Sequence, residues 1–384
     1  MIRHAPLRSI PALPTLAWRS LLPALAPRPP AVFPLDHLEG DRASLHYLAR
    51  NGIYHGLGAI GLGGGAVVLM PSYHHGVEVE AVRAAGCEVR FFGVGRDLVA
   101  DLDDARRRAD GARALYLIHY AGFAQPLDEA RALCRERGLV LVEDCALSLL
   151  SRAPSGEPLG AAGDLSVFCL YKTLPLPHGG VAVGPAALPL GRRPPLLSTL
   201  HHVAGSLRAH AALERGPMPL WDAARALARR SVDRVVRAEQ TGTRHLDPAQ
   251  LDLGVSALVE RLLTRIDADG IVVRRRRNYR RLLDALGDER RAVAGPLAAG
   301  ACPLFFPLLV ADKAAARARM EQSAIECVDF WSDGDPACDA ALFADTAWLR
   351  RHVLEVPIHQ DLDDESLDQV ARAVKEEVAA CPMP

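Results

Sequence analysis

Between residues 44 and 184, short apolar runs alternate with amphipathic segments, and this alternation constrains the fold more than any other feature. The amphipathic segments, which predict helices, are 51–61, 76–86, 101–110 and 126–138. The apolar runs, which predict strands, are 66–70, 88–94, 114–119, 139–143, 165–170 and 181–183. Continuous apolar strands separated by helices indicate βαβ units and a mainly parallel sheet covered on both faces.

The chain changes character after residue 184. Proline-rich connections lead into Arg-rich helices, expected at 221–238, 255–268 and 271–287. Further strands and helices, separated by loops, are expected at 303–310, 313–322, 325–330, 353–357 and 364–379. This mixture predicts a smaller α+β domain. We therefore expect an N-terminal arm over 1–35, a large α/β domain over 36–240 and a smaller C-terminal domain over 241–384.

The run Arg274–Arg277 is one place where basic residues concentrate. It continues at helical spacing, so a solvated helix face is a simpler interpretation than a phosphate or nucleic-acid contact.

Residues 1–35 contain no acidic residue, four arginines and eight prolines. A basic, acid-poor targeting peptide is one interpretation. However, proline interrupts each apolar stretch and no small-residue cleavage pattern stands out. The favoured prediction is an arm that packs on the body of the protein or on a partner subunit.

Charge and cysteine usage exclude several classes of protein. The net charge is −1, so no overall electrostatic attraction to nucleic acid or anionic membranes is expected. No uninterrupted apolar stretch of about 18 residues predicts a spanning helix. The eight cysteines form no CxxC pair, which is typical of reduced thiols in a cytoplasmic protein and predicts no metal site.

The segment from Gly56 to Gly61 matches the GxGxxG pattern of dinucleotide-binding folds. That motif must follow a strand and open a helix, so that the pyrophosphate meets free backbone N–H groups. Here the glycines fall within a predicted helix and at its end. The sequence therefore disfavours nicotinamide chemistry.

A stronger signal comes from Asp144 and Lys172. Asp144 ends an apolar strand, and ligand groups collect at the carboxyl ends of strands in open α/β folds. Lys172 comes at the end of another apolar strand and is one of only three lysines. A buried lysine has a lowered pKa and can form a Schiff base, and a buried Asp suits a protonated ring nitrogen. The pair suggests pyridoxal 5′-phosphate (PLP).

A structural interpretation of the same two residues remains open at this point. Asp144 could cap a helix over 145–151, and Lys172 could extend to the surface.

The chain resembles the DegT/DnrJ/StrS sugar aminotransferases, a group of PLP enzymes of fold type I, over about residues 45–380. The resemblance rests on an ordered set of segments: Ala49-Arg50-Asn51-Gly52, Met70-Pro71-Ser72-Tyr73-His74-His75, Ile118-His119-Tyr120-Ala121-Gly122, Val142-Glu143-Asp144-Cys145-Ala146, Lys172-Thr173-Leu174-Pro175 and Val356-Pro357-Ile358-His359-Gln360. It implies a large sheet domain of the seven-stranded type, mainly parallel, and a smaller α+β domain.

The resemblance also implies roles for individual residues. Lys172 would be the Schiff-base lysine and Asp144 the partner of the pyridine nitrogen. His75 would stack on the cofactor ring. The helix N-terminus at Arg50, Asn51 and Gly52 would receive the phosphate, since its N–H groups and dipole favour an anion. Cys169 occupies the position of a phosphate ligand. The catalytic residues would thus be Lys172 and Asp144.

Four departures from the family pattern weaken the expected grip on the cofactor. Cys169 replaces the usual Ser, and a thiol is a weak donor. Leu147 replaces the Gln or His expected near the phenolic oxygen. The Ser-Gly usually found before Arg50 is missing. The Asn-Tyr-Arg segment that reaches a neighbouring subunit is not evident near 252–255.

Three functions are consistent with this sequence. The leading one is a PLP-dependent aminotransferase that moves an amino group from an amino acid to a keto group, with a nucleotide-linked sugar as one candidate acceptor. The second keeps PLP but performs elimination, decarboxylation or condensation. The third is a degenerate relative without catalysis. The resemblance further implies a homodimer.

Overall fold

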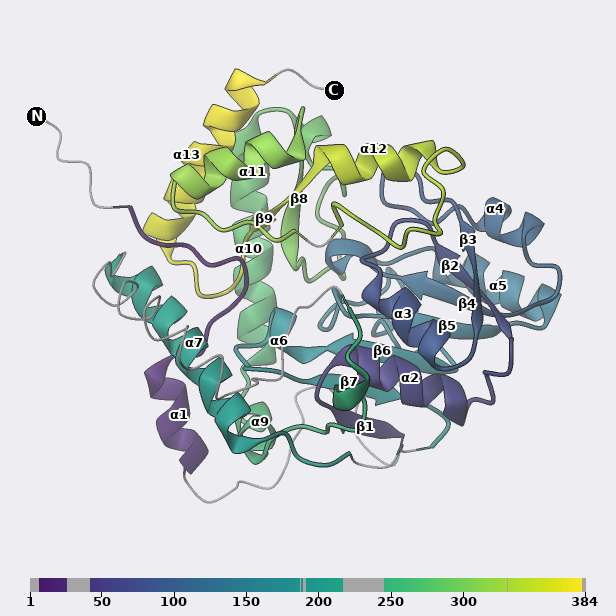
Figure 1. The fold of residues 1–384 in the computed structure, drawn as a ribbon. Coiled ribbons are helices and arrows are strands. Elements are labelled where there is room, and N and C mark those ends of the chain that lie inside the picture. Colours follow the sequence, from purple (N-terminus) through teal and green to yellow (C-terminus); the bar gives the residue numbers. More distant parts are fainter. Residues whose placement is uncertain are drawn as a thin grey trace, which may run out of the picture.

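The computed structural model describes residues 7–25, 42–186, 188, 191–216, 245–329 and 331–381. A seven-stranded sheet in the order β1-β7-β6-β5-β4-β2-β3 organises the larger part (Figure 1). Neighbouring strands from β3 to β6 run parallel, whereas β7 is antiparallel to both β6 and β1. The predicted fold class, a mainly parallel α/β sheet, is confirmed. The strands are β1 (Ala43–His46), β2 (Val67–Pro71), β3 (Glu88–Phe92), β4 (Ala112–Ile118), β5 (Val140–Asp144), β6 (Leu165–Cys169) and β7 (Gly180–Val183).

Helices cover both faces of this sheet, as the alternating pattern predicts. One face packs against α2 (Ala49–Ala59) and α3 (Val77–Ala84). The other packs against α4 (Leu102–Arg107), α5 (Leu127–Arg137), α7 (Leu196–Arg215) and α9 (Ala257–Leu263). Successive residues of one strand go to opposite cores: Leu115 and Leu117 of β4 to one, Ala114 and Tyr116 to the other. Because side chains alternate between the two faces of a strand, every second residue lies on the same face of the sheet, and the side chains that form the site share one face.

The C-terminal part forms a smaller unit with its own core. The antiparallel pair β8 (Phe305–Leu309) and β9 (Val353–Pro357) packs against α10 (Ala268–Leu286), α11 (Lys313–Gln322) and α13 (Asp364–Ala380). These elements match the expected α+β mixture. The boundary at residue 240 falls in a segment that the structure does not describe, so the predicted division into domains stays a prediction.

Several sequence predictions were wrong or incomplete. Residues 325–329, the described part of the strand expected over 325–330, do not form a strand; Ile325 and Val328 make only isolated bridges, to Ile10 and Glu355. The expected helix over 255–268 is the shorter α9. Several elements were missed: β1, a short edge strand; α7, whose pattern Gly205 interrupts; and the helices α1 (Trp18–Leu25), α6 (Leu170–Thr173) and α12 (Ala344–His352). The expected helix over 221–238 lies outside the described residues.

The arginine run on α10 is not uniformly solvated. Arg275 is 0% exposed, so its interpretation as part of a solvated face was wrong. Arg274 and Arg277 do remain about half exposed, at 44% and 49% of their side chains. The helical period of 3.6 carries Arg275 inward while its neighbours point outward.

The described part of the N-terminal segment packs on the body of its own chain. Ile10 exchanges backbone hydrogen bonds with the segment after α11, through Ala324 and Glu326. The Leu16 N–H donates to Ser206 Oγ of α7 over 2.8 Å, and Leu16 is fully buried. The short helix α1 (Trp18–Leu25) follows. The first of the two predicted options, an arm packed on the body, therefore holds for residues 7–25.

The GxGxxG glycines lie in α2 and just after it, as the sequence indicated. A Cβ on Gly56 would come 2.5 Å from Leu165 Cδ1, so this glycine lets α2 pack closely on β6. Gly61 has φ +75°, the left-handed conformation that often follows a helix end. These glycines serve packing and helix termination. Separately, none of the described helices is long and apolar enough to cross a bilayer.

A buried ion pair supports the smaller unit and gives a stability prediction. Lys313 Nζ lies 2.8 Å from Glu355 Oε1, and both side chains are nearly fully buried. Burial raises the pKa of Glu355 to about 7, although Lys313 opposes this. We expect Lys313→Met to lower the unfolding free energy by about 3–5 kcal/mol, because it leaves a buried carboxyl without its cation.

The pH dependence of this loss has a definite sign. The folded protein holds the Glu355 proton more tightly than the unfolded chain does. The contribution of Glu355 to stability therefore falls as pH rises through the folded-state pKa of about 7. Without Lys313 the ionised carboxylate costs more, and the deficit should be larger near pH 8 than near pH 6 in urea unfolding. Lys375→Met, at an exposed position, is the control. Equal stability of the two variants would contradict the prediction.

Candidate active site

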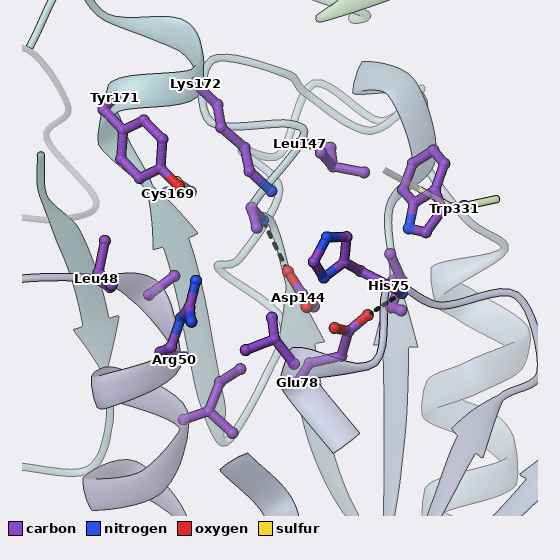
Figure 2. Close-up of a pocket in the computed structure, with 15 residues that line it drawn as sticks. Leu48, Arg50, His75, Glu78, Asp144, Leu147, Cys169, Tyr171, Lys172 and Trp331 are labelled. Atoms are coloured by element: carbon purple, nitrogen blue, oxygen red, sulfur yellow. Dashed lines mark hydrogen bonds between the residues drawn. The ribbon is translucent and has the colours of Figure 1, made fainter. Parts of the chain in front are cut away.

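The pocket that holds most predicted site residues opens at the carboxyl ends of three parallel strands (Figure 2). Ile118, Asp144 and Cys169 are the last residues of β4, β5 and β6, and all three line it. Parallel strands bring such ends to one edge of the sheet. The remaining walls come from the N-terminal ends of α2 and α3, from two residues after β5, from two residues after β6, and from Trp331. The full lining is Leu48, Ala49, Arg50, Ile53, His75, Val77, Glu78, Ile118, Asp144, Ala146, Leu147, Cys169, Tyr171, Lys172 and Trp331.

Asp144 lies at the floor of this pocket and is held on both carboxylate oxygens. The Tyr116 hydroxyl donates to Oδ2 over 2.7 Å, and the Ala146 N–H donates to Oδ1 over 2.8 Å. Burial raises the pKa of Asp144, while these two hydrogen bonds and the charge of Lys172 act in the opposite direction. The carboxyl group is therefore suited to share a proton with a ligand nitrogen.

Lys172 reaches the same pocket from the connection between β6 and β7. It lies in the one-turn helix α6 (Leu170–Thr173), not at the end of the strand itself. Figure 2 shows its amine directed into the pocket, toward Asp144. The sequence predicted a buried lysine, and this was wrong: Lys172 is only half-buried. The interpretation in which it extends away to the surface is not what the structure shows.

His75 and Glu78 form the side of the pocket next to Asp144. His75 precedes α3 and is half-buried, and its backbone N–H donates to Glu78 Oε1 over 2.8 Å. Figure 2 shows the His75 ring beside Asp144, where it can face a flat ligand. Burial raises the pKa of Glu78, and the charge of Asp144 raises it further. Glu78 was not predicted from the sequence.

Of the three residues expected to receive the phosphate, only Arg50 lines the pocket. Its Nη1 also donates to the His245 carbonyl over 2.8 Å. Asn51 is 1% exposed, and its Nδ2 donates to the Gln250 carbonyl over 2.6 Å and to two nearby carbonyls. A Cβ on Gly52 would lie 3.0 Å from Ala182 Cβ of β7. Asn51 and Gly52 thus anchor α2 by packing, while the expected binding of a phosphate by the backbone N–H groups of this helix end stays a prediction.

Cys169 and Leu147, the two residues that differ from the family pattern, also line the pocket. Cys169 is 2% exposed, and burial raises the pKa of its thiol, so the sulfur stays a neutral, weak donor. Leu147 is 3% exposed and belongs to the core that includes Tyr116 and Val167. Each residue therefore combines core packing with a place on the pocket wall, and neither supplies a strong polar group.

Sequence reasoning missed four polar or aromatic residues at or behind this site: Tyr116, Glu78, Tyr171 and Trp331. Tyr116 carried a detectable signal, because it lies on β4 two residues before Ile118 and so shares its face. Trp331 had none, since it comes from the C-terminal part and meets the pocket only through tertiary packing. Its ring lies 5.0 Å from that of Tyr73.

His119, Glu143 and Cys145 form a buried group with metal-ligand chemistry behind the pocket. His119 Nε2 lies 3.0 Å from Glu143 Oε2, and His119 Nδ1 accepts from the Gln125 N–H over 3.0 Å. Both ring nitrogens are therefore engaged within the protein. The Gly160 N–H also donates to Glu143 Oε2. The group ties β4 to β5 just before Asp144.

The chemistry of the pocket fits PLP. An amine and a carboxyl group lie near each other, with an imidazole ring beside the carboxyl. The N-terminus of α2 and Arg50 lie at the pocket and provide positive potential for a phosphate. A Cβ on Gly180 would lie 2.3 Å from the Ala49 nitrogen, so glycine is needed for β7 to approach this helix end.

Comparison with known proteins shows similarity to one family over part of the chain. Residues 49–183 match the model of the DegT/DnrJ/EryC1/StrS aminotransferase family. A GDP-perosamine synthase from Vibrio cholerae is 30% identical over 131 residues, covering 33% of this chain and 35% of that protein. A dTDP-4-dehydro-2,3,6-trideoxy-D-glucose 4-aminotransferase from Saccharopolyspora spinosa is 34% identical over 124 residues, covering 31% and 32%. The chain thus matches about a third of the length of these curated relatives.

Solved structures extend the likeness to nearly the whole chain at the level of fold. The aminotransferase TlmJ from Streptoalloteichus hindustanus has a TM-score of 0.67 and 19% identity, with 97% of this chain and 99% of that one covered. Spr1654 from Streptococcus pneumoniae in its PLP form has a TM-score of 0.69 and 14% identity, with 97% and 99% covered. The matched segment 49–183 contains Arg50, Asp144 and Lys172, so the part of the chain that carries these three residues is similar to the DegT/DnrJ/EryC1/StrS aminotransferase family.

Proposed function

We propose that this protein is a PLP-dependent aminotransferase that moves an amino group from an amino acid to a keto group of a sugar-like substrate. One observation carries the proposal: Lys172 and Asp144, from separate elements, converge on one pocket with complementary chemistry. The match of residues 49–183 to the family model and the sugar aminotransferase activity named for the Saccharopolyspora relative support it. Fold likeness alone would not, since one fold hosts many activities.

Five residues would hold the cofactor. Lys172 is the amine that attaches it, Asp144 is the partner of its ring nitrogen and His75 is the ring beside it. Arg50 and the N-terminus of α2 would bind the phosphate, with Cys169 adding a weak contact. When bound, PLP supplies an electron sink for the bond that breaks at the amino-bearing carbon.

Lys172 would also act as the general base and acid of the reaction. Its Nζ, once free, would accept the proton from the α-carbon of the amino donor and later return a proton to the acceptor carbon. The Lys172 side chain is half-buried and points from α6 into the pocket, so its amine can reach a bound substrate. The largely apolar walls, among them Ile53, Leu147 and Trp331, would limit water access.

An absorbance scan of the purified protein tests the proposal. Added PLP should give a band that borohydride reduction fixes on the protein, and a suitable amino donor should then convert it to the amine form of the cofactor. Stable covalent attachment without conversion by any amino donor would favour the second candidate, a PLP-dependent lyase or condensing enzyme.

A degenerate, non-catalytic relative is the third candidate, and two observations favour it. Leu147 offers no hydrogen bond to the cofactor, and the buried Cys169 offers only a weak one. Absence of PLP binding at millimolar concentration would support this candidate and reject the aminotransferase.

Two substitutions distinguish an enzyme that binds PLP weakly from a degenerate relative without catalysis. Cys169→Ser should tighten PLP binding a few-fold to about tenfold, since one neutral hydrogen bond contributes about 0.5–1.5 kcal/mol. Leu147→Gln should raise transamination if the natural residue limits it. Cofactor titration and a half-reaction assay measure the two effects. If neither substitution produces binding or turnover, the degenerate interpretation stands.

We also propose a homodimeric assembly and a reducing cellular compartment. The dimer is implied by the family resemblance, and residues 7–25 pack on their own chain. Light scattering at micromolar concentration with PLP should give twice the chain mass; a monomer would contradict the prediction. The eight unpaired cysteines support a reducing compartment such as the cytoplasm.

A further inference from the structure

Arg275 is a fully buried arginine outside the pocket whose role the proposed reaction does not explain. It lies on α10 and is the largest fully buried side chain in the described part of the protein. Among the described residues no carboxylate makes an ion pair with it. A buried guanidinium without such a partner is costly unless its N–H groups are satisfied by other acceptors.

The acceptors of Arg275 come from three distant parts of the chain. Nη1 donates to the Leu304 carbonyl over 2.7 Å and to the Pro303 carbonyl over 3.2 Å. Nε donates to Gln360 Oε1 over 2.8 Å. Nη2 donates to the Thr173 carbonyl over 3.3 Å. Arg275 thus links α10, the entry to β8, the segment after β9, and α6.

Thr173 receives a second hydrogen bond from the same cluster. Gln360 Nε2 donates to the Thr173 carbonyl over 3.1 Å. The Gln360 side chain is therefore fixed at both ends, accepting from Arg275 and donating to Thr173. One turn further along α10, Asn278 Nδ2 donates to the Ile358 and His359 carbonyls, which holds the segment that carries Gln360.

Thr173 is the last residue of α6 and directly follows Lys172. A helix of four residues has no stability of its own, so outside contacts must hold it. Its internal support is the bond from the Leu174 N–H to the Leu170 carbonyl, over 2.8 Å. The Thr173 carbonyl accepts hydrogen bonds from Arg275 and Gln360. Through these two bonds the C-terminal part of the chain holds this turn.

We propose that Arg275 and Gln360 are positioning residues for Lys172. By donating to the Thr173 carbonyl, they fix the turn from which the Lys172 amine enters the pocket. We call Arg275 and Gln360, together with the Thr173 carbonyl that they bind, the clamp. The inference rests on the proposed role of Lys172, but the geometry of the clamp does not depend on PLP. A simple structural role would affect stability throughout the C-terminal part, whereas a positioning role changes the reactivity of Lys172 in a folded protein.

The scarcity of lysine makes this testable without the cofactor. Lys172, Lys313 and Lys375 are the only lysines, so the rate of acylation of each by a trace of acetic anhydride can be followed by peptide mass spectrometry across pH. Lys375 is exposed on α13, and it provides the internal reference.

Gln360→Glu is the main variant. It keeps an acceptor for Arg275 Nε and adds an opposite charge, so the fold should be retained. It replaces the donor to Thr173 with a carboxylate oxygen. Arg275→Lys is the second variant, since it keeps a cation but cannot reach all the acceptors. Arg276→Met is the control: its guanidinium also binds backbone carbonyls, those of Ala298 and Ala301, with no contact to α6.

We expect both clamp variants to shift the pH profile of Lys172 acylation and to slow the covalent attachment of PLP about five- to tenfold, the size set by losing one hydrogen bond. The profile of Lys375 should not move, and Arg276→Met should match the unmodified protein. An unchanged Lys172 profile in folded Gln360→Glu would overturn the inference. A shifted profile without any borohydride-trapped PLP on Lys172 would instead reject the proposed function and leave the clamp in place.

Discussion

Lys172→Ala should abolish covalent attachment of PLP. The substitution removes both the amine that attaches the cofactor and the base that moves the proton, so turnover should fall by at least the 10²–10⁴-fold, in order of magnitude, that general acid–base catalysis contributes. Borohydride reduction followed by peptide mapping measures attachment, and a half-reaction with an amino donor measures turnover. Little change in unfolding free energy is expected, since the Lys172 side chain is only half-buried.

The other two lysines provide matched controls for this experiment. Lys375→Ala, on the exposed side of α13, should leave attachment and turnover unchanged. Lys313 is held by Glu355 in the smaller unit and is not among the residues that line the pocket. A reduced adduct found on Lys313 or Lys375 in the unmodified protein would refute the assignment of Lys172.

Asp144→Asn should reduce turnover far more than cofactor affinity. The amide keeps the shape of the side chain and can still accept from the Tyr116 hydroxyl or the Ala146 N–H. It cannot carry the negative charge that holds a proton on the ring nitrogen. A hydrogen bond to a charged group contributes about 1.5–3 kcal/mol, so affinity should fall about ten- to a hundredfold. Turnover should fall further, because the ring loses its protonated form.

Tyr116→Phe tests whether the effect belongs to the carboxylate itself. It removes one donor to Asp144 but leaves the charge, so its effect on turnover should be much smaller than that of Asp144→Asn. Cofactor titration and single-turnover absorbance changes separate binding from chemistry. Turnover close to that of the unmodified protein in Asp144→Asn would contradict the role proposed for this carboxyl.

The pattern of alternating apolar runs predicted the architecture well because it reflects a local physical requirement. Strands covered on both faces must be apolar throughout, and the helices between them need one apolar stripe. Five of the six predicted strands in this region start within one residue of the observed ones, and the sixth, β4, starts two residues earlier. The short edge strand β1 and the one-turn α6 escaped because their few residues carry no period.

Individual site residues were predictable where they follow a strand. Asp144 and Cys169 end β5 and β6, and Lys172 comes three residues later, so their meeting follows from parallel strand order. Asn51 and Gly52 were not predictable in this way. Neighbours on a helix face different directions, and only packing against 250–253 and β7 shows that they point away from the pocket.

What the sequence alone determined is the parallel sheet and the pair Asp144 and Lys172 at its edge, since strand period and strand ends are local properties. Tertiary structure decided the rest of the site. Trp331 reaches the pocket from the C-terminal part of the chain. Arg275, one arginine in a run, is buried because α10 turns that position toward the carbonyls of Thr173 and Leu304. The contact with Thr173 joins residues 102 positions apart, and no local pattern encodes it.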